Sequence, residues 1–173
     1  MQEKLPNDLK ISKSFIISIE TKNTVIMNPI LRNILAVIAG IIVGSLVNMA
    51  IAYLGPTLIP PPEGADILTM EGLRASMGIF EPKHFLMPFL AHALGTLAGA
   101  FVAAKLGITR KTLLALIVGI FFLAGGIAMV VQLPSPLWFT LLDLVVAYVP
   151  MSLLGAALAK SRTSTIQSNV LLS

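Results

Sequence analysis

The chain has 173 residues, of which 56% are hydrophobic and 12% are charged. An ordinary soluble domain is roughly 45–50% apolar and about 25% charged, so this composition excludes a soluble enzyme, a nucleic-acid-binding module and a disordered chain. The sequence contains no cysteine, which excludes disulfides, thiolate chemistry and metal sites with cysteine ligands. The net charge of +4 reflects the uneven placement of lysine and arginine in a membrane protein and does not indicate a nucleic-acid partner.

Long apolar segments predict membrane-spanning helices, because a helix needs about 20 apolar residues to cross roughly 30 Å of hydrocarbon. Pro134-Ser135-Pro136 separates the last two segments and predicts a tight helical hairpin. The predicted fold class is therefore all-α, an integral membrane four-helix bundle within residues 27–160. Its four predicted spans are residues 34–54, 85–104, 113–133 and 137–159.

The positions of lysine and arginine predict the orientation of the bundle. Ten of the 12 basic residues precede the first segment, join the second to the third, or follow the fourth. Cytoplasmic connections collect lysine and arginine. We therefore expect both termini in the cytoplasm, with the loop 55–84 in the periplasm or outside the cell and the bundle in a bacterial inner (plasma) membrane.

The long loop carries a helix signal of its own. Thr69 can cap a short amphipathic helix in which apolar residues recur at helical spacing. Such a helix lies in the membrane interface or folds over the mouth of the bundle. The apolar residues are Met70, Leu73, Met77 and Phe80.

The two ends of the chain differ from its apolar centre. Residues 1–26 are polar and charged, and are interpreted either as a flexible cytoplasmic extension or as an over-long gene model that should start at Met27. Residues 161–173 are expected to form a cytoplasmic tail. Arg32 and the apolar run 34–47 also resemble a cleavable signal peptide, but the apolar stretch continues beyond that run, which favours an uncleaved spanning helix.

Three polar side chains are predicted at one level within the membrane. Asn48 lies six residues before the end of its segment, His92 seven after the start of its own, and Asp143 six after the start of the fourth. At about 1.5 Å per residue, all three fall roughly 9–11 Å below the same boundary. Small residues share their helix faces, as where membrane helices meet. We therefore predict that the three side chains point into the bundle.

Two further residues extend this polar layer toward the loop. Glu81, His84, Pro88 and His92 are spaced 3, 4 and 4 residues apart, which places them on one side of a helix. A carboxylate and two imidazoles that descend toward Asp143 form a plausible entry path for protons or cations. The candidate ligand- or proton/cation-binding residues are thus Asp143, His92, Asn48, His84 and Glu81.

Each candidate also has a purely structural interpretation. A bond between Asp143 and His92 can act as a clamp between helices, and Asn48 can serve packing alone. Glu81 and His84 can be solvated loop residues. No ligand spacing supports a metal site, and no cofactor is predicted. The sequence has no HExxH or GxSxG motif and no phosphate-binding glycine loop, so catalysis is disfavoured and no reaction is indicated.

Parts of the chain resemble segments of small four-pass bacterial inner-membrane proteins with no assigned activity. The resemblance covers about residues 27–159 and implies a location, without a catalytic role for any residue. The stretches that carry it are Phe80-Glu81-Pro82-Lys83-His84-Phe85, Ala91-His92-Ala93-Leu94-Gly95-Thr96 and Leu142-Asp143-Leu144.

Three functions are compatible with these features. In the first, a permease-like or ligand/cation-binding membrane protein, Asp143 carries the exchangeable charge, His92 shares its proton and Asn48 orients both. In the second, a non-catalytic subunit or assembly factor, the glycine stripes of the first two segments (Gly40 and Gly44, Gly95 and Gly99) are surfaces for a larger membrane complex. The third is a membrane enzyme without a recognisable motif. The expected partners are the lipid bilayer and either further copies of the chain or another membrane subunit.

Overall fold

The computed structural model describes residues 28–171, with side chains described for residues 28–160. The predicted extension 1–26 therefore lies outside the described residues, as do the side chains of the predicted tail. All regular structure in the described part is helical. Four of its helical segments are long and apolar enough to cross a membrane. The all-α, multi-pass membrane prediction is confirmed.

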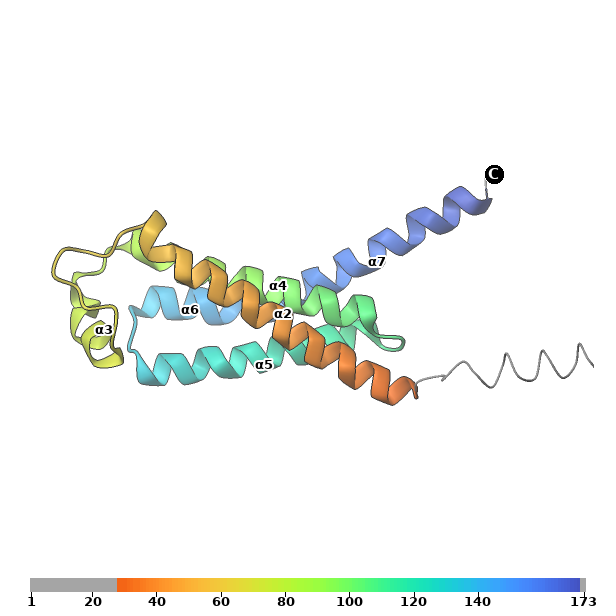
Figure 1. Cartoon of the computed structure of the whole chain (residues 1–173), viewed down its shortest axis with the longest axis horizontal. Coiled ribbons are helices and arrows are strands. Elements are labelled where there is room, and N and C mark those ends of the chain that lie inside the picture. Colours follow the sequence, from red (N-terminus) through yellow and green to blue (C-terminus); the bar gives the residue numbers. More distant parts are fainter. Residues whose placement is uncertain (1–27, 172–173) are drawn as a thin grey trace, which may run out of the picture.

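The four spans lie side by side, and both ends of the described chain emerge at the same end of the bundle (Figure 1). We call this the termini end and the opposite one the loop end. The first span is α2 and the third is α5. The second consists of a short 3₁₀ turn, η2, followed by α4, and the fourth of α6 followed by α7. Their bounds are α2 Pro29–Leu58, η2 Pro82–Phe85, α4 Leu86–Leu106, α5 Lys111–Gln132, α6 Leu137–Val146 and α7 Val149–Leu171.

Helix α2 has 30 residues and extends beyond the predicted segment 34–54 at both ends. Its N-terminus is capped by Asn28, whose side-chain oxygen accepts a hydrogen bond from the Ile30 N–H at 2.9 Å. At the other end the helix continues past Pro56, and the Ile59 N–H still bonds the Gly55 carbonyl at 2.8 Å. Hydropathy marks only the apolar part of a span, so it missed these polar or proline-containing turns.

Helix α2 packs closely against α4 through glycines. A Cβ atom on Gly40 would lie 2.5 Å from the backbone oxygen of Gly99, and one on Gly44 would lie 2.7 Å from that of Gly95. Only residues without a side chain allow helices to approach this closely. The glycine stripes identified in the sequence therefore face each other inside the chain.

The termini half of the bundle is filled by alanines from three helices. Ala100 and Ala104 of α4, Ala115 of α5, and Ala156 and Ala159 of α7 form one buried cluster. Gly155 adds a further close contact, since a Cβ there would lie 2.7 Å from the Leu97 backbone oxygen. Small side chains thus bring α4, α5 and α7 into tight contact below the polar layer.

The last span is two helices rather than the continuous one expected from residues 137–159. Helix α6 ends at Val146 and α7 begins at Val149. Pro150 has no N–H to bond the Val146 carbonyl, which weakens the helix at this point. Tyr148 lies in the break and is 2% exposed. The break changes which side chains of this span face the centre of the bundle.

The loop between α2 and α4 is ordered by its own hydrogen bonds. It contains α3 (Met70–Ser76) and the 3₁₀ turn η1 (Met77–Ile79), and the Thr69 hydroxyl caps α3. The Asp66 carboxylate accepts hydrogen bonds from the Leu68 N–H at 2.8 Å and the Thr69 hydroxyl at 2.9 Å. These bonds, that of Leu68 first, lower the pKa of Asp66 below its usual value.

The lowered pKa of Asp66 predicts that the loop loses order in acid. The folded loop gains from the ionised carboxylate above the pKa of an unfolded aspartate, and this gain disappears as pH falls through the lowered, folded-state pKa. Hydrogen exchange at the Leu68 amide should therefore be slower in wild type than in Asp66→Asn near neutral pH. The two proteins should become alike in acid, and a difference that persists there would contradict the role of the carboxylate.

Helix α3 lies over the loop end and is tied to α5. The Arg74 guanidinium donates to the Gln132 backbone carbonyl, with its Nε at 3.0 Å and a second bond from Nη2. Leu73 and Met77 line a cavity inside the bundle. The loop helix is thus positioned as a cover over this cavity.

Removing the Arg74 contact is expected to loosen α3. Hydrogen bonds from charged groups contribute about 1.5–3 kcal/mol when protected, and solvent exposure reduces this to about 1 kcal/mol. Arg74→Gln should therefore speed hydrogen exchange in α3 by roughly fivefold, with little change in the spans. Lys83→Gln is the matched control, since Lys83 lies in the same loop and pairs with the exposed Glu81. Equal effects of the two variants on hydrogen exchange would show that the Arg74–Gln132 contact does not hold α3 in place.

Candidate functional site

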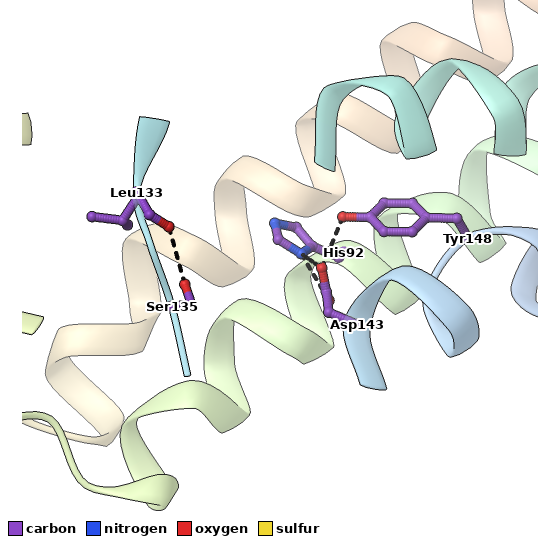
Figure 2. Close-up of polar contacts among 5 residues, drawn as sticks. All are labelled: His92, Leu133, Ser135, Asp143 and Tyr148. Carbon is purple, nitrogen blue, oxygen red and sulfur yellow. Dashed lines mark hydrogen bonds and ion pairs between the residues drawn. The ribbon is translucent and has the colours of Figure 1, made fainter. Parts of the chain in front are cut away.

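Three side chains form a polar cluster inside the bundle (Figure 2). The Nδ1 atom of His92 on α4 lies 3.0 and 2.9 Å from the two carboxylate oxygens of Asp143 on α6. The Tyr148 hydroxyl donates to Oδ2 of Asp143 at 3.0 Å. We call these residues the His–Asp–Tyr cluster. It connects α4 to α6 and to the break that follows α6.

The cluster fixes which nitrogen of His92 carries hydrogen. A carboxylate can only accept, so the hydrogen of a neutral His92 lies on Nδ1 and Nε2 becomes an acceptor. Figure 2 shows Nε2 on the side of the ring away from Asp143 and Tyr148. Asp143 is 4% exposed, and donors from two residues offset the cost of burying its charge.

Two cavities meet at His92. The larger, of about 330 Å³, lies between α4, α5 and α6 under the cover of α3. The smaller, of about 260 Å³, lies between α2 and α4. Both are lined by His92, whose side chain is 25% exposed, and by His84. His92 therefore lies on the wall of both cavities, in the half of the bundle nearer the loop.

A glycine on α5 makes room for the cluster. A Cβ on Gly126 would collide with the Tyr148 hydroxyl and ring, so the phenol reaches Asp143 only because this position has no side chain. Ala147 and Tyr148 are both buried and pack with Ala93 of α4. The cluster thus depends on small residues of α4 and α5 as well as on its own hydrogen bonds.

Asn48 lies apart from the hydrogen bonds of the cluster. It lines the smaller cavity together with His92, is half-buried, and makes no side-chain hydrogen bond among the described residues. Its Cβ lies against Gly95, where an added Cβ would be 2.9 Å away. The contact that orients Asp143, expected from Asn48, comes from Tyr148.

The two candidates nearer the loop, His84 and Glu81, lie in different surroundings. His84 lines both cavities, and its Nδ1 accepts from the Glu81 backbone N–H at 2.9 Å, which leaves the hydrogen of the neutral ring on Nε2. The Glu81 carboxylate is exposed and pairs with Lys83 at 2.9 Å, and this pairing lowers its pKa. The structure therefore brings His84 and His92 to shared cavities and leaves Glu81 outside them.

Tyr148 was not among the candidates from the sequence. It follows Asp143 by five residues, which on an unbroken helix is about 140° around the axis. Pro150 was the available signal, because a helix interrupted just before it can bring two such residues together. Within the described residues, no group of three or more His, Cys, Asp or Glu side chains is placed to hold a metal ion.

Loss of the Tyr148 hydroxyl is expected to destabilise the protein without creating a cavity. Tyr148→Phe keeps the buried ring and removes one of the donors to Asp143, which should cost about 1–3 kcal/mol. Thermal or denaturant unfolding in detergent measures the change. Tyr53→Phe is the control, because Tyr53 is 84% exposed and its substitution should be neutral. An equal effect of both substitutions would argue against the hydrogen bond to Asp143.

Comparisons with protein-family models, with curated proteins and with solved structures find no match to this chain.

Proposed function

We propose that this chain is a multi-pass membrane protein that binds a small ligand or cation at Nε2 of His92. The observation that supports this most directly is the pairing of His92 Nδ1 with both oxygens of Asp143. It holds the ring in one orientation and leaves the opposite nitrogen as an acceptor, in a residue that lines two cavities. A bond that served only as a clamp between helices would need no such opening.

The packing below the cluster favours a binding site over a permease path. Gly40, Gly44 and Gly155 each meet the backbone of a neighbouring helix at distances that leave no room for a side chain. A ligand that passed between α2 and α4, or between α4 and α7, toward the termini end would have to separate these contacts. We therefore infer a site that is open from the loop end alone.

The same contacts weaken the second function expected from the sequence, a subunit or assembly factor. Its main argument was that the glycine stripes are surfaces for a partner. Those on α2 and α4 face each other within the chain. They therefore give no reason to propose a larger complex.

We also propose that the loop end faces the periplasm or the outside of a bacterial inner membrane. The described residues at the termini end include five basic ones, and cytoplasmic connections are rich in such residues. In this orientation the ligand enters from outside the cell. The five residues are Arg32, Lys105, Arg110, Lys111 and Lys160.

Thermal unfolding of the purified protein in detergent, with a panel of cations and small organic molecules, tests the proposal. A ligand present at 100 times its Kd should stabilise wild type by about 2.7 kcal/mol, and Asp143→Asn should lose this response. Glu81→Gln is the matched control, because it also changes a carboxylate to an amide but lies outside the cavities. An Asp143→Asn protein that responds like wild type to every compound would contradict the proposed site.

A further inference from the structure

The charges around the two cavities narrow the class of ligand. Among the described residues that line them, Asp143 is the one carboxylate and none is lysine or arginine. The two basic side chains of the neighbouring loop are engaged elsewhere. Arg74 donates to the Gln132 carbonyl, and Lys83 pairs with Glu81. An anionic ligand would therefore find no opposite fixed charge at the cavity wall.

The His–Asp–Tyr cluster carries one net negative charge when Asp143 is ionised and the other two groups are neutral. A charge within the membrane is costly unless it has a counter-charge. Either a proton on Nε2 of His92 or a cationic ligand bound to that nitrogen supplies one. His84, also on the wall, is neutral in the form that accepts the Glu81 N–H. The electrostatic balance of the site thus favours a cation that can donate a hydrogen bond.

The rest of the larger cavity suits an apolar body attached to such a cation. Phe80, Phe85 and Phe139 all line it. The rings of Phe85 and Phe139 are 4.8 Å apart, and those of Phe80 and Phe85 are 6.4 Å apart. Aromatic faces attract cations as well as hydrocarbon. At about 330 Å³ the cavity is at the small end of ligand pockets, which span roughly 300–1,000 Å³.

We propose that the ligand of this site is a small apolar amine in its protonated form; this rests on the function proposed above. The ammonium donates a hydrogen bond to Nε2 of His92, and Asp143 balances its charge through the imidazole. The hydrocarbon part lies among Phe80, Phe85 and Phe139. A proton on Nε2 removes the acceptor, so the amine and the proton compete, and acid should weaken binding. The other titratable groups that face His92 are Asp143, Tyr148 and His84.

Trp138 provides a direct reporter, because it is the single tryptophan of the chain. Its ring packs edge-on against Phe85 at 5.6 Å and Phe139 at 5.8 Å, which both line the larger cavity. The full-length protein in detergent would be titrated with benzylamine, benzyl alcohol and benzoate, which share one ring and differ in charge. We expect a saturable change in fluorescence with benzylamine, at a Kd at least tenfold below that of benzyl alcohol, and none with benzoate.

Asp143→Asn should abolish the preference for benzylamine, and Glu81→Gln should keep it. Phe80→Leu tests the aromatic wall without touching the cluster and should weaken benzylamine severalfold more than benzyl alcohol. If benzyl alcohol or benzoate bound at least as tightly as benzylamine, and this binding depended on Asp143, the proposal of an amine ligand would be wrong. The proposed ligand site would still be supported. If none of the three compounds showed binding that depends on Asp143, the proposal of an amine ligand would also be wrong. The proposed ligand site itself would be contradicted only if no compound in the thermal-unfolding experiment gave a response that depends on Asp143.

Discussion

Asp143→Ala is expected to lower the free energy of unfolding by about 2–6 kcal/mol, because two donors each lose their acceptor at a cost of about 1–3 kcal/mol. The substitution leaves the His92 Nδ1–H and the Tyr148 O–H without an acceptor in a position where Asp143 is 4% exposed. It also leaves space where the carboxylate was. Denaturant unfolding in detergent measures the loss.

A double-mutant cycle with His92 distinguishes this bond from general packing. Once His92 is alanine, Asp143→Ala should cost less, with a coupling energy of about 0.5–3 kcal/mol. Asn48→Ala is the matched control, because it removes a polar group at a similar depth and keeps the Cβ that lies against Gly95. If Asn48→Ala were as costly as Asp143→Ala, or the cycle showed no coupling, the His92–Asp143 bond would not hold the helices together.

The spans and the central pair could be predicted from the sequence because they follow from one-dimensional quantities. Apolar length gives the spans, and rise per residue gives depth. His92 and Asp143 share a depth and lie on faces with small residues, so their contact follows. Asn48 shares the depth as well, but depth does not specify position around the bundle axis. The glycines of α2 hold Asn48 against α4, away from Asp143.

Tyr148 and the cover over the cavity depend on contacts that hydropathy and spacing do not encode. The register of a continuous helix separates Tyr148 from Asp143, and only the break before Val149 joins them. The position of α3 depends on Arg74 and a backbone carbonyl 58 residues away. Any residue type has such a carbonyl, so no pattern of side chains indicates this contact in advance.

Gly99→Leu is expected to separate α2 from α4 and to destabilise the protein by at least about 3 kcal/mol. The Cβ alone would lie 2.6 Å from the Gly40 oxygen, 3.2 Å from Val118 and 3.3 Å from the Gly44 Cα. Overpacking costs about 1–3 kcal/mol where side chains can adjust, and here two of the three neighbours are backbone atoms of another helix. Unfolding in detergent, with Gly125→Leu as control, measures the effect, because an added Cβ on Gly125 meets nothing within 4 Å.

The consequence of Gly99→Leu for the site differs from that of Asp143→Ala. Helix α2 supplies Asn48 and Ala52 to the wall of the smaller cavity, whereas the His–Asp–Tyr cluster joins α4 to α6 and to Tyr148 in the break after α6. A displaced α2 should therefore widen the smaller cavity and weaken ligand binding while the Asp143-dependent preference for a cation remains. If Gly99→Leu removed that preference as completely as Asp143→Asn, the cluster would require the α2–α4 contact as well as its own hydrogen bonds. If Gly125→Leu were equally destabilising, close packing of α2 on α4 would not explain the loss.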